Sequence, residues 1–506
     1  MELDYTLQLI CLQLQNKIGI IMLYNSRYAI IFLGLIGICF SACISDTKIY
    51  APDKFTGKIS QYTVQTMPFK VFPKDFLWGI ATASCQIEEI SSKLIPHIPH
   101  APNTLTSEYL DRFKSDERVS KMLDNWQEPG ESSRGYSQAK QLVDLAQSMG
   151  CNSYRFSIEW ARVEPKPGEF NQEVIEHYVE LCRYIRSKNM TPMVWLHHYI
   201  DPIWFMDKGG FTTTENTQYF IEYCNKMVDA LSPYVDMFVV TNQATAYAYK
   251  GYNRGSQMPF IKDDIKTSKK VAHSMLQATC DVARHIRSKG KSTGVCHQHV
   301  QNEYKEHPEL SSDLNDGKQR AKDFYEEYTK IFIDFFTNTA ENKDLFDFVA
   351  VHYYSRYRFG YIDGYGKVPC DFYPHEAALR TDDGFRFIDG EGLYEAIQFF
   401  NKLFPHKPLY VVETGINTKD ENFAIQFMNT YISTIIKAIQ DGIPVKGLMF
   451  WTLIDNYEWG KNFTSRFGFF SRMEQKPYKR AWYYQQVINE FKKTYGIPSK
   501  VSELAY

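Results

Sequence analysis

From Phe72 onward, short apolar runs alternate with longer stretches in which apolar residues recur every three or four positions. The short runs are rich in β-branched and aromatic residues, which is typical of buried strands, whereas the longer stretches have the period of amphipathic helices. The predicted strands are 76–80, 153–158, 192–197, 237–242, 294–298, 348–353, 409–413 and 447–451. The predicted helices are 137–149, 172–188, 217–231, 267–288, 323–336, 392–403 and 422–440. This alternation favours a parallel sheet, and eight strands over about 420 residues predict an α/β fold of the (β/α)8 TIM-barrel type.

Polar side chains follow several of these strands at the point where each strand ends. The run Tyr410-Val411-Val412-Glu413 is an apolar strand that ends in a carboxylate, and Gly415 turns the chain soon afterwards. By itself, Glu413 is better explained as a solvated acid at a strand end. The strand 237–242 ends in Asn242-Gln243, however, and the strand 447–451 leads to the segment Asp455-Asn456-Tyr457-Glu458-Trp459, which carries two acids and a tryptophan. Active sites of α/β barrels lie at the carboxyl ends of the strands, so these residues predict a sugar-binding pocket there.

Six motifs carry a more specific signal because they occur in one order along the chain. They are 72–84 with Gln86-Ile87-Glu88, 154–162, Leu196-His197-His198 with Trp204 and 209–211, the strand ending in Glu413, 451–459, and Arg466-Phe467-Gly468. Together they resemble the motifs of glycoside hydrolase family 1, the β-glucosidase-type retaining glycosidases. The resemblance extends from about residue 72 to residue 491.

The resemblance implies a role for each matching residue. Glu413 stands where the family has its nucleophile, one of the two carboxylic groups that a retaining glycosidase uses. Arg155 and Tyr354 match residues that contact that carboxylate, and a nearby guanidinium would keep it ionised. The residues that would hold the sugar through its hydroxyls are Gln86, His198, Asn242 and Glu458, and those that would form a flat platform for its ring are Trp451 and Trp459.

Simpler explanations exist for some of these residues. Arg155 also fits a buried structural ion pair, and a lone histidine such as His198 also fits a satisfied core position. Trp204 and Phe205 either line the leaving-group side or pack in the core.

The chain also departs from the family pattern at several positions. Gln243 occupies the place of the acid/base glutamate, and Ala244 occupies the place of the proline that follows it. His352 replaces an asparagine two residues before Tyr354, and Thr414 replaces the asparagine that usually follows the nucleophile. An amide neither gives nor takes a proton near neutral pH, so ordinary general acid catalysis is absent at position 243. Plant thioglucosidases of the family also carry glutamine there, because a thiol-type leaving group departs without a proton.

Three functions follow from this combination. We expect a retaining hydrolase of β-linked glucosides or galactosides, with Glu413 as nucleophile and Gln243 orienting water in the second step. One alternative is a sugar-binding protein on an enzyme scaffold, with little or no turnover. Another is a transglycosidase, in which an acceptor sugar replaces water.

The composition of the chain limits the classes of partner and cofactor that we expect. The chain has 506 residues and a formal net charge of -2, without a basic stripe, so we expect no nucleic-acid partner. Its 10 cysteines are scattered and form no CxxC pair, which argues against a zinc site or a disulfide framework and favours buried thiols. We expect no metal and no cofactor; the expected partner is a β-glycoside.

The amino terminus has a different pattern from the rest of the chain. Arg27 precedes an apolar stretch, 28–40, which Ser41-Ala42-Cys43 follows. This order is typical of a bacterial lipoprotein signal cleaved before Cys43, although Phe40 fits that signal poorly. The protein would then be exported and attached to a membrane; an uncleaved anchor and a secreted form are the alternatives, and Met22 is a second candidate start. We therefore divide the chain into 1–43 (extension and signal-like segment), 44–70 (tether), 71–493 (barrel) and 494–506 (tail), with 90–134 as a lid.

Overall fold

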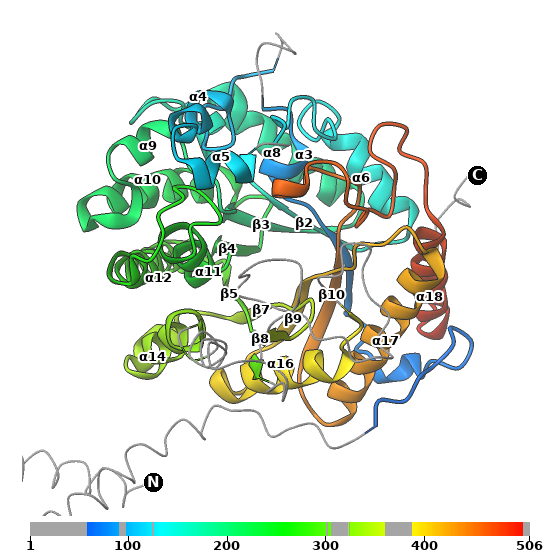
Figure 1. Ribbon diagram of the computed structural model, residues 1–506. Helices are drawn as coiled ribbons and strands as arrows, with labels where there is room; N and C mark the ends of the chain where they lie inside the picture. The colour runs from blue at the N-terminus through cyan, green and yellow to red at the C-terminus, as the bar shows by residue number, and fades with distance from the viewer. Residues whose placement is uncertain are drawn as a thin grey trace, which may run out of the picture. The chain divides into compact units, whose positions relative to one another are not determined.

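The computed structural model describes residues 58–90, 98–123, 126–299, 302–304, 322, 324–359 and 387–498. Eight parallel strands close into a barrel in the order β1-β10-β9-β7-β5-β4-β3-β2, and helices surround it (Figure 1). These strands are β1 (Leu77–Ala81), β2 (Ser153–Ser157), β3 (Thr191–His197), β4 (Met237–Thr241), β5 (Ser292–Gln298), β7 (Phe348–His352), β9 (Leu409–Thr414) and β10 (Val445–Trp451). The predicted (β/α)8 barrel and all eight predicted strands are confirmed.

The helices of the described residues differ more from the prediction than the strands do. The α-helices are α3 (Ser84–Ile87), α4 (Ser107–Leu110), α5 (Glu117–Leu123), α6 (Ala139–Ser148), α7 (Trp160–Val163), α8 (Gln172–Ser187), α9 (Ile203–Asp207), α10 (Thr214–Leu231), α11 (Ala244–Ala248), α12 (Ile265–Ser288), α14 (Ile331–Thr337), α15 (Ala340–Asp344), α16 (Gly390–Leu403), α17 (Glu421–Gln440) and α18 (Lys479–Thr494). The 3-10 helices are η2 (Phe69–Val71), η3 (Asp111–Phe113), η4 (Gly210–Thr212) and η8 (Trp459–Lys461), and the π-helices are η5 (Tyr249–Asn253) and η7 (Tyr325–Lys330). A separate strand pair is β6 (Asn302–Tyr304) with β8 (Tyr357–Phe359). The predicted helix 323–336 is divided between η7 and α14.

The helix α18 was not predicted. Its Tyr484 hydroxyl donates to the carbonyls of Gly79 and Leu448, and these contacts hold the helix against β1 and β10.

The barrel interior is filled by side chains from most of its strands. The cluster consists of Met193, Trp195, Val239, Cys296, Phe348, Ala350, Val412 and Met449. On β9, Val412 belongs to this interior cluster, and its neighbour Val411 is also fully buried. A strand that is covered on both faces needs apolar residues at consecutive positions, which explains the unbroken apolar run before Glu413.

A β-bulge in β9 sets the direction of its last side chains. Val351 of β7 pairs with Val411, but the next residue, His352, pairs with Glu413, so Val412 is an extra residue in the ladder. Bulges re-aim side chains and are common near active sites. The bulge brings Val412 and Glu413 to the same side of the strand. Val412 packs in the barrel interior, and Glu413 contacts residues across the barrel mouth. Beyond them, a Cβ on Gly415 would lie 2.1 Å from the Trp451 carbonyl oxygen, so only glycine fits that turn.

The connection between β1 and α6 contributes a small apolar core of its own. Tyr109, Leu110 and Val119 from α4 and α5 pack against Ile203 and Phe260, which follow β3 and β4. Residues 91–97 and 124–125 of this connection lie outside the described residues. The predicted lid 90–134 therefore packs, where described, on the loops at the carboxyl ends of the strands.

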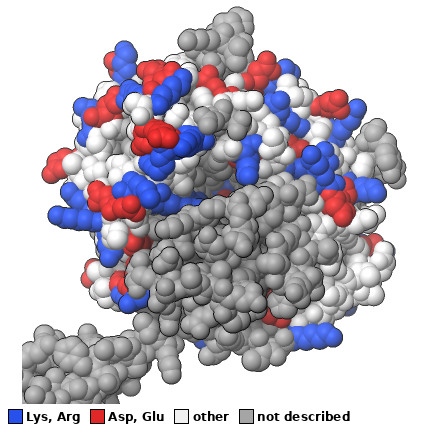
Figure 2. Space-filling view, in the orientation of Figure 1, with Lys and Arg blue, Asp and Glu red and all other residues white. Residues whose placement is uncertain are grey.

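The chain separates into two units, 1–52 and 53–506, and the described residues belong to the second. The signal-like segment, Cys43 and most of the predicted tether lie outside the described residues. Among the described helices, none combines the length and the apolar character needed to cross a membrane. Figure 2 shows acidic and basic side chains interspersed over the described part of one face.

Candidate active site

Glu413 lies at the carboxyl end of β9 and is 6% exposed. Its Oε1 accepts a hydrogen bond of 2.8 Å from the Tyr354 hydroxyl, and its Oε2 lies 3.2 Å from both Arg155 Nη2 and His352 Nδ1. Burial alone would raise the pKa of Glu413, but the charges of His352 and Arg155 outweigh burial and hold this pKa well below its ordinary value. The carboxylate is therefore ionised at neutral pH and is held through both of its oxygens.

Arg155 is the hub of the polar network in the barrel mouth. It projects from β2, is completely buried, and has its guanidinium 4.2 Å above the Trp195 ring. Its Nη2 donates a hydrogen bond of 2.9 Å to Asn242 Oδ1 and lies 3.3 Å from His198 Nδ1. Burial and the charge of Arg155 hold the pKa of His198 well below its ordinary value, so this imidazole is neutral and accepts from the guanidinium. One side chain thus joins Glu413 to Asn242 and His198.

Gln243 follows Asn242 directly at the end of β4. Its backbone is left-handed (φ 53°), which turns the chain into α11 and lets two consecutive side chains enter the mouth. Its Oε1 accepts a hydrogen bond of 2.5 Å from the Tyr199 hydroxyl, and its Nε2 lies 2.6 Å from His352 Nδ1. The rings of Tyr199 and Trp459 pack edge to face, with centroids 5.7 Å apart. Sequence reasoning missed Tyr199, and it noted His352 only as a departure from the family pattern.

The remaining predicted residues lie on the β1 and β10 side of the mouth. Trp451 ends β10, and its indole donates a hydrogen bond of 2.8 Å to Glu458 Oε1. The His198 ring lies nearly parallel to that of Trp451, with centroids 6.1 Å apart. Gln86 donates from Nε2 to the Tyr457 carbonyl at 2.8 Å, which anchors the β10 loop to the β1 loop. A continuous set of contacts therefore connects the predicted residues around the mouth.

Trp204 and Phe205 have the packing role that was one of their two expected alternatives. Phe205 is completely buried, and its ring lies 4.7 Å from that of Trp160. Trp204 packs on the same ring, and its indole donates a hydrogen bond of 2.9 Å to the Glu164 carbonyl. These contacts place both side chains in the aromatic core around α7 and α9.

A second set of buried charged residues lies behind α3 and was not predicted. Arg162 Nε is 3.3 Å from Glu88 Oε2, and the Tyr178 hydroxyl donates to the same carboxylate at 2.9 Å. Burial raises the pKa of Glu88 to about 7, against the opposing charge of Arg162. Glu159 is buried beside them, accepts from Asn103 at 3.0 Å and also has a raised pKa because of burial. The signal for Glu88 was present in the motif Gln86-Ile87-Glu88, but nothing in that motif predicts its partners.

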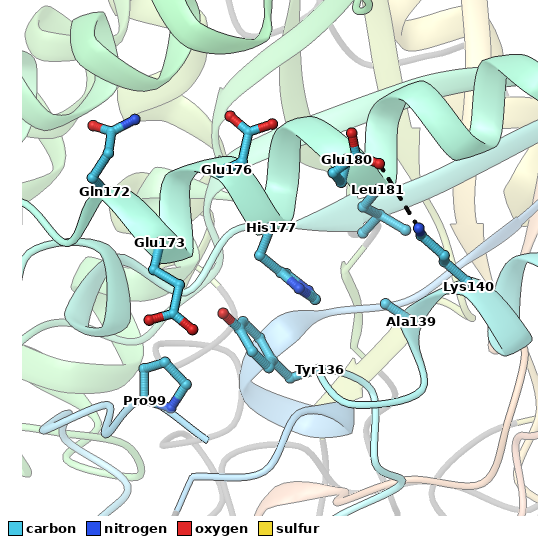
Figure 3. Close-up of a pocket in the computed structure, with 10 residues that line it drawn as sticks. All are labelled: Pro99, Tyr136, Ala139, Lys140, Gln172, Glu173, Glu176, His177, Glu180 and Leu181. Atoms are coloured by element: carbon cyan, nitrogen blue, oxygen red, sulfur yellow. Dashed lines mark ion pairs between the residues drawn. The ribbon is translucent and has the colours of Figure 1, made fainter. Parts of the chain in front are cut away.

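A pocket of about 650 Å³ lies outside the barrel, between α6 and α8 (Figure 3). None of the predicted site residues lines it. Tyr136 in its wall is covered on one face by the His177 ring at 3.8 Å and on the other by the Arg162 guanidinium at 4.4 Å. Neither face of this ring is open for stacking on a sugar. Lys140 and Glu180 form an ion pair of 3.8 Å across the pocket rim.

The free thiols are another predicted feature. Cys85, Cys151, Cys182, Cys224, Cys280 and Cys296 are free and buried, which confirms the expectation for these six. No group of histidine, cysteine, aspartate and glutamate side chains among the described residues is arranged to hold a metal ion.

Comparison with known proteins gives the same fold. The chain is 26% identical over 462 residues to beta-glucosidase A of Acetivibrio thermocellus, covering 82% of this chain and 98% of that protein. It is 25% identical over 490 residues to a 6-phospho-beta-galactosidase of Clostridium acetobutylicum, covering 83% and 98% of the two chains. The solved beta-glycosidase from Pyrococcus horikoshii superposes with a TM-score of 0.68 at 25% identity, covering 85% of this chain and 99% of the other.

The family comparison covers most of the chain. The model of glycosyl hydrolase family 1 matches residues 69–342 and 337–493, a range that contains every strand of the barrel and all the residues of its mouth described above. The chain therefore belongs to glycosyl hydrolase family 1.

Proposed function

We propose that the protein is a retaining β-glycoside hydrolase in which Glu413 is the nucleophile and Gln243 stands at the acid/base position. The observation that carries this proposal is the state of Glu413: a buried carboxylate at the barrel mouth, kept ionised by His352 and Arg155 and oriented by Tyr354. Membership of the family makes the chain a glycosidase. The ionised carboxylate supplies the first chemical requirement of the retaining reaction.

In the first step, a Glu413 oxygen forms a bond to the anomeric carbon while the glycosidic bond breaks. The bonding electron pair leaves with the aglycone, and no carboxylic acid at position 243 supplies a proton to it. In the second step, water attacks the glycosyl ester, its proton passes to solvent, and Glu413 departs as a carboxylate. Arg155 and Tyr354 then bind the restored anion, whereas Gln243 can only orient the attacking water.

The rim of the mouth favours a neutral sugar over a phosphorylated one. Glu458 carries a carboxylate there and accepts the Trp451 indole hydrogen at 2.8 Å. A carboxylate suits sugar hydroxyls as an acceptor, but it repels a phosphate at close range. Among the activities named for the relatives, we therefore assign a glucoside or galactoside rather than a 6-phospho sugar.

A sugar-binding protein with little turnover is the second candidate, and one observation favours it. The side chain at position 243 is an amide, which has no acidic proton to give to a leaving group. Transfer of the glycosyl group to a second sugar is a variant of the first proposal, because it uses the same intermediate.

Turnover of two substrate types separates these candidates. General acid assistance is worth about 10²–10⁴-fold, and nitrophenolate leaves without needing it. The quantity to measure is the ratio of kcat/KM for a nitrophenyl β-glycoside to kcat/KM for the matching alkyl glycoside or disaccharide. We expect this ratio to be at least about 10²-fold larger than in an enzyme that has the acid. Addition of an acceptor sugar tests transfer. Sugar binding without turnover of any substrate would support the binding protein and overturn the hydrolase.

A further inference from the structure

His352 lies between the two positions that the proposed chemistry uses. It is completely buried at the end of β7, and its Nδ1 is 2.6 Å from Gln243 Nε2 and 3.2 Å from Glu413 Oε2. Its other ring nitrogen, Nε2, is 3.2 Å from Cys296 Sγ. A single imidazole atom therefore separates the amide from the carboxylate. Because the ring is buried below the mouth, it acts on substrate only through these neighbours.

Hydrogen-bond accounting allows two arrangements of the amide. If Nδ1 carries no proton, it accepts from Gln243 Nε2, and the same lone pair faces the Glu413 anion. If Nδ1 carries a proton, Nδ1–H faces Glu413 and donates to the amide oxygen of Gln243, which a half-turn of the amide brings to that side. The Nε2 of Gln243 then donates to the Tyr199 hydroxyl oxygen. Because the Glu413 carboxylate lies 3.2 Å from Nδ1, only the second arrangement avoids placing a lone pair against the anion.

The surrounding charges select the protonated form. Burial opposes the charge, but the Cys296 sulfur and the Glu413 carboxylate raise the pKa of His352 to about 9. The other titratable groups nearby are Arg155, which pairs with the same Glu413 oxygen, and two buried histidines, His198 and His297, whose pKa values burial lowers well below the ordinary value. Both of those histidines are neutral. The imidazolium of His352 therefore shares the Glu413 carboxylate with Arg155 and donates a hydrogen to position 243.

We propose that His352 is a positioning residue that makes glutamine, rather than glutamate, the working side chain at position 243. A carboxylate in this place would lie in hydrogen-bond contact with a buried cation, and an opposite charge at that distance favours the ionised form, which cannot donate a proton. A neutral amide accepts the same hydrogen and leaves the charge of His352 to Glu413. This inference rests on the proposed function and specifies its substrates: glycosides whose leaving group departs as a stable anion.

The proposal predicts that glutamate alone does not restore acid catalysis. In Gln243→Glu, the new carboxylate pairs with His352 and stays ionised, so hydrolysis of a disaccharide rises less than threefold, well short of what an acid supplies. In Gln243→Glu with His352→Asn, the cation is gone and the carboxylate can hold a proton. Disaccharide hydrolysis then rises by about tenfold or more over the wild-type chain. Since His352→Asn by itself adds no acid, it does not produce this gain.

The experiment compares these four chains with a matched control. Each is assayed from pH 4 to about pH 10, a span that covers both carboxyl and imidazole titration, with a nitrophenyl β-glycoside and with cellobiose. His297→Asn is the control, because it removes another buried histidine, which stacks at 4.2 Å on Phe332 outside the barrel. With the nitrophenyl substrate, kcat of the wild-type chain falls as pH rises through about 9, because the carboxylate leaves the glycosyl-enzyme less readily without the cation. This inflection is absent in His352→Asn and retained in His297→Asn.

Mass labelling by a 2-fluoro glycoside keeps this test separate from that of the proposed function. If no chain is labelled, the proposed function fails. If chains are labelled but Gln243→Glu alone gives the full gain, or the double variant gives no more than Gln243→Glu, the inference about His352 is overturned. The double variant could also lose its gain in disaccharide hydrolysis by misfolding. An unchanged melting temperature and retained turnover of the nitrophenyl substrate show that it is folded.

Discussion

Removal of the Tyr354 hydroxyl tests how much its hydrogen bond to the Glu413 carboxylate contributes to the reaction rate. In Tyr354→Phe, Oε1 of Glu413 loses a hydrogen bond of 2.8 Å, and both side chains are buried. A hydrogen bond to a charged group is worth about 1.5–3 kcal/mol, which corresponds to roughly a ten- to hundredfold change in rate. Because Arg155 and His352 still hold Oε2, we expect the lower end of that range, about tenfold.

The loss should fall mainly on the second step. The carboxylate is a neutral ester in the glycosyl-enzyme and regains its charge as water attacks, so a donor at Oε1 favours departure of the sugar. With a dinitrophenyl β-glycoside, we expect kcat to fall about tenfold and KM to fall with it. Rapid mixing should show a larger burst of released phenolate, because the intermediate accumulates.

Tyr353→Phe is a matched control for this experiment. Tyr353 is the adjacent residue and is also buried, but its hydroxyl donates to Asp389 Oδ2 at 2.6 Å, away from Glu413. This variant should lose stability without a change in the burst. A Tyr354→Phe chain with kcat within twofold of the wild type and no added burst would refute the reasoning.

Three further predictions concern other parts of the chain. Cys43→Ser should release the protein from membranes if lipid on Cys43 holds it there; unchanged retention in fractionation would indicate an uncleaved anchor instead. Glu413→Ala should abolish turnover, and azide should restore cleavage of a nitrophenyl glycoside with inverted product; an anomer of retained configuration by NMR would contradict the assignment. Glu88→Gln should gain stability relative to the wild-type chain, by up to about 3 kcal/mol, as pH rises from 4.5 to about 7. The reason is that the folded chain holds a proton on Glu88 that the unfolded chain releases over this range, so urea unfolding at several pH values should show wild-type stability falling relative to the variant.

The periodicity of the sequence was sufficient to predict the barrel and the position at which each strand ends. Each strand is a compact apolar run, so its position depends mainly on local residues, as the confirmed strand β9 illustrates. Motif order singled out Glu413, Arg155 and Asn242, which the structure joins through the Arg155 guanidinium. The helix α18 was missed because its hold on the barrel depends on Tyr484, whose bonds to β1 and β10 span most of the chain.

The details of the site depend on contacts that no local pattern contains. The bulge at Val412, which aims Glu413 into the mouth, results from how β9 pairs with two other strands. The contacts of Gln243 with Tyr199 and His352 join three different strand ends, and the left-handed turn at Gln243 carries no glycine to signal it. Sequence alone therefore singled out Gln243, but not the contacts that Tyr199 and His352 make with it.

The central claim is that Glu413 forms a covalent bond to the sugar. The most direct measurement is the intact mass of the wild-type chain after incubation with a 2-fluoro β-glycoside that carries a dinitrophenolate leaving group, followed by peptide mapping. We predict a mass increase of one fluorosugar, located on the peptide that contains Glu413 and absent in Glu413→Gln. An unlabelled chain that still binds the sugar, or a label on another residue, would contradict the account.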